Sequence, residues 1–121
     1  MAESDIVLGF DAGTSSLKGA LFGKDGQALA SGAENYPLTL PQAGWAEQNP
    51  DDWWRAMERL TPRLLAEAKA DPARIGAIGI AAQMCGVVPV DEQGHALTNT
   101  LIWLDTRSSR EARELIGGAP A

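Results

Sequence analysis

The order of the apolar segments constrains the fold of this chain most strongly. Three short apolar runs come first, over residues 6–10, 17–22 and 27–31, and turn-forming residues separate them. A long amphipathic segment follows over residues 50–68, and a fourth run of small and apolar residues covers residues 75–82. Short runs predict strands, and the long segment predicts a helix. This order predicts an α/β fold in which the helix packs on one face of a sheet.

The first three strands are expected to form an antiparallel meander. The run Ile6–Phe10 shows no alternation and ends at Asp11, which predicts a strand buried on both faces. Small residues after it predict a tight turn. Asp25 and Gly26 predict a hairpin between the second and third strands, since such a pair readily takes positive φ. The fourth strand, residues 75–82, is expected to pair parallel with the first.

The long amphipathic segment carries several helix signals. Asn49 is a candidate N-cap, and Pro50 suits the first helical position. Pro62 lies inside the apolar stripe, so we expect it to kink or divide the helix. The apolar residues expected on one helical face are Trp53, Trp54, Met57, Leu60, Leu64, Leu65 and Ala68.

The last third of the chain gives weaker signals. Residues 86–90 and 101–104 are candidate strands, and residues 91–94 form a turn after the first of them. A final helix is predicted from about Ser108 to Ile116. Gly117 is expected to end this helix.

Composition limits the function classes. The 121 residues include 10 Lys and Arg against 16 Asp and Glu, a net charge of −6. This charge disfavours binding to nucleic acid or to an anionic membrane surface. The single cysteine, Cys85, cannot form an internal disulfide, and no apolar run approaches the length of a membrane span. The first residues lack the basic start of a secretory signal. We therefore expect a soluble, cytoplasmic protein.

The segment FDAGTSS, residues 10–16, is the first candidate site. Asp11 ends a strand, where a buried carboxylate needs a compensating partner, and Gly13 allows the backbone to approach a ligand closely. The N–H groups and hydroxyls of Thr14 and Ser15 can form an anion-binding concavity. A carboxylate beside phosphates can hold Mg²⁺, usually through water. These residues predict a site for nucleotide phosphates and Mg²⁺. The alternative is a plain hairpin whose turn is capped by Asp11.

A second candidate site follows the fourth strand. Gln83, Met84 and Cys85 lie at the C-terminal end of that strand, where open α/β sheets bind ligands. The indole face of Trp103 suits the C–H groups of a sugar, and Asp105 could contact sugar hydroxyls. Each has a structural alternative. Met84, Cys85 and Trp103 could be core residues, and Asp105 could cap a helix or form an ion pair.

Four stretches resemble the N-terminus of the FGGY carbohydrate kinases, a family within the actin-like ATPase superfamily. They occur in the family's order and cover most of residues 5–110. The first stretch is shared by many actin-like ATPases. The second and third narrow the resemblance to sugar kinases, and most closely to xylulokinase-like members. The stretches are IVLGFDAGTSSLKGALF, GWAEQNPDDWW, IGAIGIAAQMCG and LIWLDTRS.

The resemblance implies the ribonuclease-H-like fold of actin-like ATPases and ATP-dependent phosphorylation of a sugar or polyol, most favourably a ketopentose such as xylulose. In that family the aspartate matching Asp11 helps to bind Mg–ATP, and the turn matching residues 13–15 approaches the phosphates. The pair matching Met84 and Cys85 contacts the sugar in xylulokinase-like members. Xylulokinases commonly carry histidine where this chain has Cys85, which bears on the identity of the sugar. A tryptophan matching Trp103 walls the substrate in the related glycerol kinases.

The resemblance places the general base, an aspartate, and the adenine-binding second domain beyond Ala121. We therefore expect residues 1–121 to be part of the N-terminal domain of a longer kinase, with no catalytic residue of their own and no activity in isolation. An uncovered strand edge would favour association, for example as a homodimer. Two alternatives stay open. One is a non-catalytic binding domain with this fold. The other is a ribonuclease-H-like nuclease, which needs carboxylates that residues 81–84 do not supply.

Overall fold

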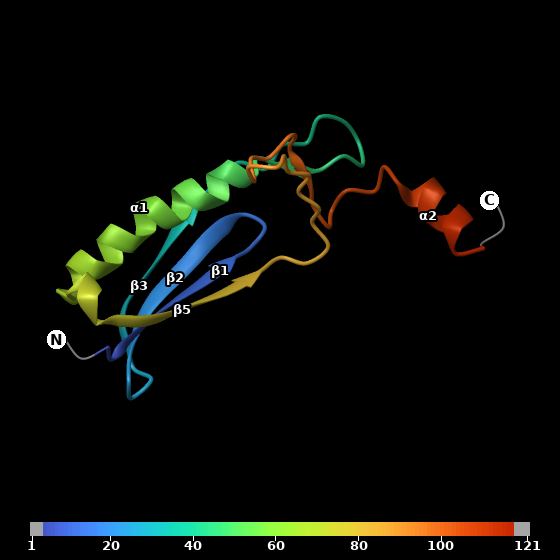
Figure 1. Ribbon diagram of the computed structural model, residues 1–121. Coiled ribbons are helices and arrows are strands. Elements are labelled where there is room, and N and C mark those ends of the chain that lie inside the picture. The colour runs from blue at the N-terminus through green and yellow to red at the C-terminus, as the bar shows by residue number, and fades with distance from the viewer. Residues whose placement is uncertain (1–3, 118–121) are drawn as a thin grey trace. The chain divides into compact units, whose positions relative to one another are not determined.

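The computed structural model describes residues 4–117, which form two compact units. The sheet unit comprises residues 4–37 and 51–83, and the loop unit comprises residues 38–50 and 84–117. Figure 1 shows that the sheet unit holds the long strands and the long helix, whereas the loop unit consists of short paired segments and a short helix.

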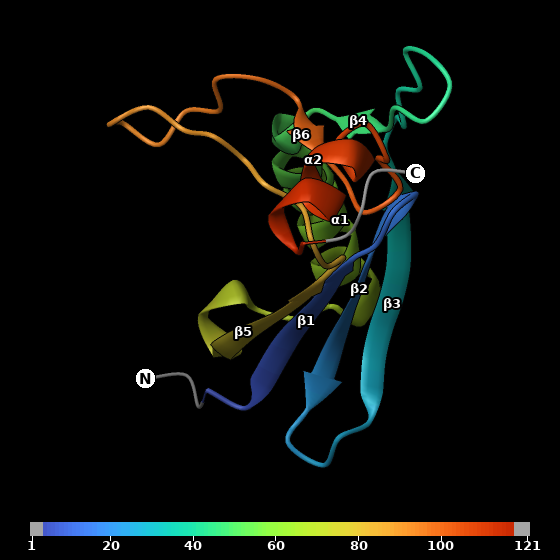
Figure 2. The same cartoon turned by 90° about the vertical axis from the view of Figure 1, so that its right-hand side faces the viewer.

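The sheet has four strands in the order β3-β2-β1-β5. The meander consists of β1 (Ile6–Ala12), β2 (Ser16–Gly23) and β3 (Ala28–Asn35), paired antiparallel. The fourth strand, β5 (Ile75–Ala82), pairs parallel with β1. Figure 2 shows these strands side by side. The predicted meander and parallel fourth strand are confirmed.

Helix α1 (Pro50–Ala68) runs along one face of the sheet (Figure 1). It begins at Pro50, as predicted, and Asp51 and Asp52 lie in its first turn, where negative charge is favourable. The sequence predicted that Pro62 kinks or divides the helix. The helix continues past Pro62, so this proline does not divide it. A proline removes the N–H that would bond the carbonyl of Glu58. Both residues are exposed, so water can bond that carbonyl instead.

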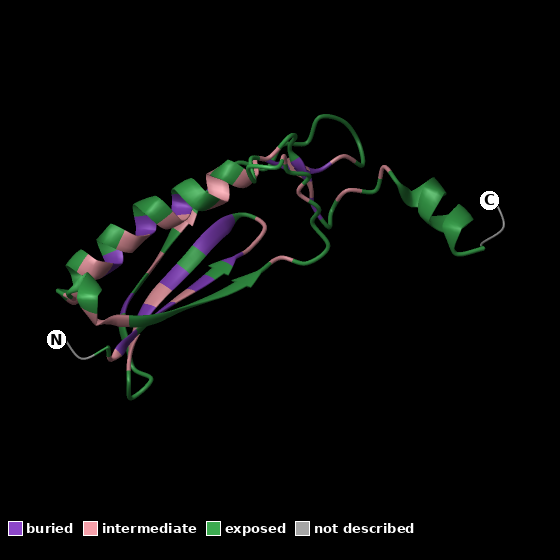
Figure 3. Ribbon diagram, in the orientation of Figure 1, coloured by how far each residue is buried: buried purple, intermediate pink, exposed green. Residues whose placement is uncertain are grey.

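The core of the sheet unit lies between α1 and the first three strands (Figure 3). β1 alternates between buried and exposed residues, so the prediction of burial on both faces was wrong. Its exposed positions include the apolar Val7, which hides the alternation in the sequence. The buried core consists of Ile6, Leu8, Phe10, Ala12, Leu17, Leu21, Ala30, Tyr36, Ala56, Leu60 and Leu64.

The buried stripe of α1 is narrower than the sequence predicts. Ala56, Leu60 and Leu64 form it, at a spacing of four residues. Trp54 was expected in this stripe but is 64% exposed, and its indole N–H donates to Glu58 at 3.0 Å. The small Ala56 therefore brings the helix close to the sheet, and the larger tryptophan faces outward.

Two glycines allow this close approach. Gly19 and Gly32 are register partners on β2 and β3. A Cβ atom at Gly19 would lie 2.9 Å from Leu60 Cδ2 and 3.1 Å from the ring of Phe10. A Cβ atom at Gly32 would lie 3.1 Å from Leu60 Cδ1. Because protein interiors are close-packed, a side chain at either position would force Leu60 to shift, most of all at Gly19.

A 3₁₀ turn, η1 (Pro72–Arg74), connects α1 to β5. Asp71 caps it by accepting a hydrogen bond from Ala73 N at 2.9 Å. Arg74 then forms an ion pair with Asp5, with Nη2 at 2.7 Å from Oδ2 and Nε at 2.9 Å from Oδ1. This two-point contact fixes the start of β5 beside the start of β1.

The loop unit contains two short strands that pair over a long sequence separation. β4 (Glu47–Gln48) is antiparallel to β6 (Thr100–Leu101). The predicted strand over residues 86–90 consists only of isolated bridges at Val87 and Val90, and β6 ends before most of the predicted strand over residues 101–104.

Helix α2 (Ser109–Leu115) agrees within one residue at each end with the predicted final helix. Gly117 follows it with a φ of 74°, as expected of a residue that ends a helix. Neither helix within residues 4–117 is both long and apolar enough to cross a membrane.

Candidate functional site

The turn between β1 and β2 holds the predicted phosphate-binding residues. The N–H of Gly13 donates to the carbonyl of Ser16 at 3.1 Å and closes the turn. A Cβ atom at Gly13 would lie 3.3 Å from that same oxygen, so a side chain there would be tightly packed against the turn. Asp11 is exposed on the open face of the sheet, so the expectation of a buried carboxylate was wrong. Its carboxylate is accessible to a ligand.

Lys18 joins this turn, although the sequence predicts no role for it. It is the register partner of Asp11 on β2, so both side chains stand on the same face of the sheet. Its Nζ would lie 3.0 Å from a Cβ atom at Gly13, which places the ammonium group against the turn. A positive charge beside a turn of backbone N–H groups favours binding of an anion.

Tyr36 fastens the turn from the end of β3. Its hydroxyl donates to the carbonyl of Gly13, and its N–H donates to the carbonyl of Ser15 at 3.3 Å. Burial raises the pKa of Tyr36 to about 12, and the negative charge of Asp11 adds to this effect. The hydroxyl therefore stays protonated and remains a donor. The sequence signal that could have found Tyr36 is its polar tip, since a buried tyrosine usually needs a hydrogen-bond partner.

An open hollow of about 630 Å³ lies on the sheet face opposite α1. Asp11, Lys18, Phe22 and Ser31 are among the residues that line it. It combines one carboxylate, one ammonium group and one aromatic ring beside the fastened turn, so it offers both charged and apolar contacts to a ligand.

β5 ends at the same edge of the sheet as β1. The N–H of Gln83 donates to the carbonyl of Ala12 at 2.9 Å, which extends the parallel pairing by one residue. The carboxyl ends of parallel strands form the edge where open α/β sheets bind ligands. The structure thus brings Gln83 close to the turn between β1 and β2.

Met84 and Cys85 belong to the loop unit. Met84 is 78% exposed and Cys85 is also exposed, so the interpretation of these two as core residues was wrong. Cys85 has a φ of 63°, a left-handed conformation that is uncommon for a residue other than glycine. The backbone at Cys85 is therefore held in a specific, strained shape.

Trp103 is 55% exposed and lies close in the fold to the segment that follows Cys85. Val87 forms a bridge with Leu101, and a Cβ atom at Gly86 would lie 3.4 Å from Thr100 Cγ2. The loop unit thus brings together two segments that carry predicted sugar-binding residues. Their exposed side chains are accessible to a ligand.

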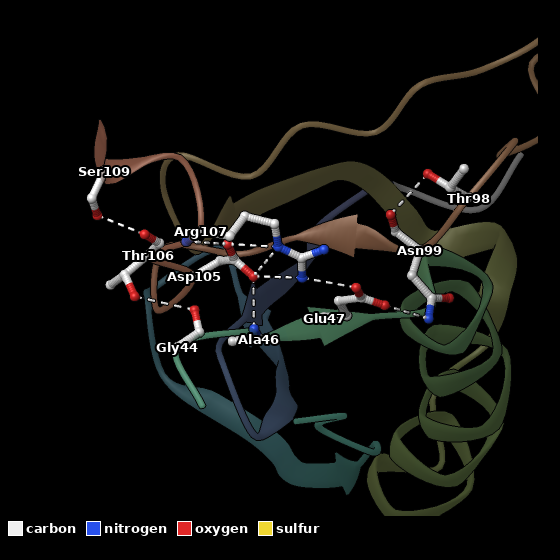
Figure 4. Close-up of polar contacts among 9 residues, drawn as sticks. All are labelled: Gly44, Ala46, Glu47, Thr98, Asn99, Asp105, Thr106, Arg107 and Ser109. Carbon is white, nitrogen blue, oxygen red and sulfur yellow. Dashed lines mark hydrogen bonds and ion pairs between the residues drawn. The ribbon is translucent and has the colours of Figure 1, made fainter. Parts of the chain in front are cut away.

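Asp105 takes part in an ion-pair network, as its structural alternative predicted. Its side chain is 5% exposed, accepts from Ala46 N at 2.8 Å and contacts Arg107 Nη2 at 2.7 Å (Figure 4). Arg107 also contacts Glu47 at 2.8 Å and lies 3.6 Å from the ring centroid of Trp45. The Arg107 guanidinium lowers the pKa of Asp105 to about 2, so this carboxylate is ionised at neutral pH.

The described residues suit a metal ion that is held jointly by one protein carboxylate and the substrate phosphates. They do not suit an ion held by several protein side chains. Within residues 4–117, no group of three or more His, Cys, Asp and Glu side chains comes together to hold a metal ion. The nuclease alternative needs such converging carboxylates. Asp11 by itself suits Mg²⁺, which usually keeps several waters and binds one or two carboxylates together with substrate phosphates.

Comparison with known proteins shows which family this chain belongs to. A family model for the "FGGY family of carbohydrate kinases, N-terminal domain" matches residues 6–119. The chain is 38% identical over 116 residues to a glycerol kinase of Gluconobacter oxydans (strain 621H), covering 95% of this chain and 22% of that protein. It is 34% identical over 103 residues to a xylulose kinase of Bacillus subtilis (strain 168), covering 85% and 21%.

Solved structures give the same result. The crystal structure of xylulose kinase from Rhodospirillum rubrum matches with a TM-score of 0.84 and 28% identity, over 93% of this chain and 23% of that one. The chain therefore spans between 21% and 23% of the length of these relatives. The predicted family and actin-like fold are confirmed. The chain belongs to the FGGY family of carbohydrate kinases, and its residues 6–119 match the model of the family's N-terminal domain.

Proposed function

We propose that this chain is part of the N-terminal domain of an ATP-dependent kinase that phosphorylates a hydroxyl group of a sugar or polyol, most favourably a ketopentose such as xylulose. The observation that carries the proposal is the turn between β1 and β2, which Tyr36 fastens and which Asp11 and Lys18 flank. The xylulose and glycerol kinases among its relatives support the same reaction class.

The turn binds the phosphates of ATP in this proposal. Gly13, Thr14 and Ser15 supply a close backbone approach and hydroxyls, and the ammonium group of Lys18 attracts the negative charge. Asp11 holds Mg²⁺ through water, and this ion neutralises charge on the phosphates. Phosphoryl transfer depends mainly on positioning and charge neutralisation, which these residues provide on the ATP side.

The sugar or polyol binds to the second set of predicted residues. Gln83, Met84 and Cys85 contact the acceptor, and Trp103 lays its exposed indole face against C–H groups. The carboxylate of Asp105 is bonded to Ala46 and Arg107. Asp105 therefore contributes to this site by stabilising the turn that carries Trp103, and not by direct contact with the acceptor. The general base and the adenine-binding domain lie in a part of the protein outside this chain.

Turnover by the full-length protein tests the proposal. We would measure ADP release from Mg–ATP with xylulose, glycerol, gluconate or no acceptor, and we expect release that depends on the acceptor and is fastest with xylulose. Asp11→Asn should lower kcat by about two orders of magnitude. Asp25→Asn is the matched control, since Asp25 is an exposed aspartate in the next hairpin, where it accepts from Gln27 N.

Three results would count against the proposal. Binding of ATP and sugar without transfer would favour the non-catalytic alternative. ADP release independent of any acceptor would contradict the sugar kinase assignment. Full turnover by the Asp11 variant would remove that residue from the site.

A further inference from the structure

Strand pairing and hydrogen bonds connect residues 44–48 of the loop unit to residues 100–106. β4 pairs with β6, Ile102 N donates to Ala46 O at 3.2 Å, and Thr106 N donates to Gly44 O at 2.8 Å. Gly44 has a φ of 79°, and a Cβ atom there would lie 2.8 Å from Thr106 Oγ1. Residues 44–48 thus form a fixed support for residues 100–106.

Trp103 lies in a tight turn whose two ends are both attached to Ala46. Asp105 N donates to Ile102 O at 2.9 Å, which closes a four-residue turn around Trp103 and Leu104. Ala46 O accepts from Ile102 at one end, and Ala46 N donates to the Asp105 carboxylate at the other end. Ile102 is 2% exposed whereas Trp103 is 55% exposed, so the turn presents the indole outward.

Arg107 holds the carboxylate that anchors this turn. Its Nε lies 2.9 Å from both oxygens of Asp105, and its Nη2 reaches Asp105 at 2.7 Å and Glu47 at 2.8 Å (Figure 4). The same guanidinium stacks on Trp45 at 3.6 Å. A planar guanidinium can form such a fork and stack at the same time, whereas an ammonium group cannot.

Most of the side-chain surface of this network is buried. The side chains of Arg107, Glu47 and Asp105 are 20%, 17% and 5% exposed. Charge-assisted hydrogen bonds in such a setting are stronger than neutral ones and fix direction as well as distance. Removing the guanidinium would leave two neighbouring carboxylates without their common partner, and they would repel each other.

We propose that Arg107 is a positioning residue that, through Asp105 and Ala46, fixes where the indole of Trp103 stands for the sugar or polyol. This inference rests on the proposed function for the identity of the ligand. The attachment of the turn is a property of the loop unit itself. In this proposal Arg107 affects binding of the acceptor through the placement of Trp103, and not through a contact of its own.

Kinetics of Arg107→Lys and Arg107→Met in the full-length protein test the proposal. We expect KM for the acceptor to rise about tenfold or more while KM for ATP stays within about twofold, since a displaced indole weakens contacts to the acceptor alone. Lysine should restore little, because it lacks the planar fork. Arg110→Met is the matched control, since Arg110 forms an exposed i,i+4 pair with Glu114 on α2. It should leave both constants unchanged.

A spectroscopic measurement separates this proposal from the proposed function. The full-length protein can be labelled with 5-fluorotryptophan, and single Trp→Phe variants assign the resonances of Trp45 and Trp103. Without any ligand, Arg107→Lys should shift the ¹⁹F resonances of both Trp45 and Trp103, and Arg110→Met should shift neither. If the ¹⁹F resonance of Trp103 is the same in Arg107→Lys as in the wild-type protein, the positioning role is overturned, whatever KM values the variant shows.

The outcomes of the two experiments remain distinguishable. If the wild-type protein is inactive but Arg107→Lys still shifts the Trp103 resonance, the kinase proposal is overturned and the positioning claim is kept. An active protein in which Arg107→Lys raises both KM values equally, or neither of them, would overturn the positioning claim and keep the kinase proposal. Because the lysine variant retains the charge, it also serves if Arg107→Met fails to fold.

Discussion

The hydroxyl of Tyr36 donates a hydrogen bond to the carbonyl oxygen of Gly13 and joins the end of β3 to the turn between β1 and β2. The N–H of Tyr36 also donates to the carbonyl of Ser15 at 3.3 Å. The carbonyl oxygens of Gly13 and Ser15 are therefore directed toward Tyr36. A carbonyl oxygen facing a phosphate would repel it, so engaging these two oxygens prepares the turn for an anion.

Tyr36→Phe should therefore weaken binding of ATP in the full-length protein. The variant keeps the buried ring and loses only the hydroxyl, which leaves the carbonyl of Gly13 without this donor. A typical hydrogen bond contributes about 1 kcal/mol, so we expect KM for ATP to rise about fivefold. KM for the acceptor should stay unchanged. Steady-state kinetics with each substrate varied in turn measure both constants.

Thr61→Val is the matched control for Tyr36→Phe. Thr61 Oγ1 donates to the carbonyl of Met57 at 2.7 Å, so the variant also removes a part-buried bond from a hydroxyl to a carbonyl. Thr61 lies on α1, away from the turn. Equal changes in KM for ATP in both variants would show that general loosening, and not the turn, causes the effect.

The ionisation of Tyr36 can be observed directly because it is the single tyrosine of the chain. Burial raises its pKa to about 12 from an ordinary value of 10. Stability from the neutral hydroxyl is thus fully present below pH 10 and is lost as the pH rises through 12. A titration of tyrosinate absorbance should show a midpoint near pH 12, and urea should show falling stability between pH 10 and 12. A midpoint near pH 10 would mean that the hydroxyl is solvent-exposed.

Much of the sheet unit could be predicted because its signals are local. The runs that form β1, β2 and β3 are short and bounded by turn residues, and Pro50 marks the start of α1. Which face of a strand is buried depends on where a helix packs, and a run of apolar residues does not contain this information. This is why β1 was expected to be buried on both faces. The outward position of Trp54 has the same cause.

The loop unit was predicted less well because non-local contacts define it. β4 and β6 have two residues each, too few to show a period, and they pair across about fifty residues of chain. The ion pair of Asp105 with Arg107 was anticipated, since the two are close in sequence. The stacking of Arg107 on Trp45 was not, because nothing near either residue points to the other. Tyr36 was missed because its partner, Gly13, lies 23 residues away, so its polar tip indicates that it needs a partner but not which one.

Gly19→Ala should destabilise the sheet unit. The added methyl group would meet Leu60 Cδ2 at 2.9 Å and the Phe10 ring at 3.1 Å, so α1 must shift or a side chain must leave its rotamer. Overpacking of this kind costs about 1–3 kcal/mol. Gly79→Ala on β5 is the matched control, because a Cβ atom there meets nothing within 4 Å. Urea midpoints of the two variants should differ clearly, and equal midpoints would contradict the close packing.

Cys85→His in the full-length protein should change the preference among acceptors. Cys85 is exposed with a φ of 63°, and histidine tolerates this conformation better than most residues. Imidazole also forms stronger hydrogen bonds than a thiol, so relative kcat/KM for xylulose, glycerol and gluconate should shift by about tenfold or more. Cys85→Ser tests whether loss of the thiol alone has this effect. An unchanged ranking in Cys85→His would place the residue outside the acceptor site.

The outer edge of β5 should make the 121-residue chain associate in solution. Ile78 and Ile80 are register partners of the buried Leu8 and Phe10, yet each is 61% exposed, because α1 does not cover β5. The strand has no charged residue and no proline, the features that usually protect a strand edge. Molar mass from light scattering should therefore rise with concentration.

Ile78→Lys should reduce this rise, because charge on an edge strand opposes pairing with a second copy. Leu115→Lys, at an equally apolar and 88% exposed position on α2, should not. A monomeric mass at every concentration would show that the exposed edge of β5 does not cause association.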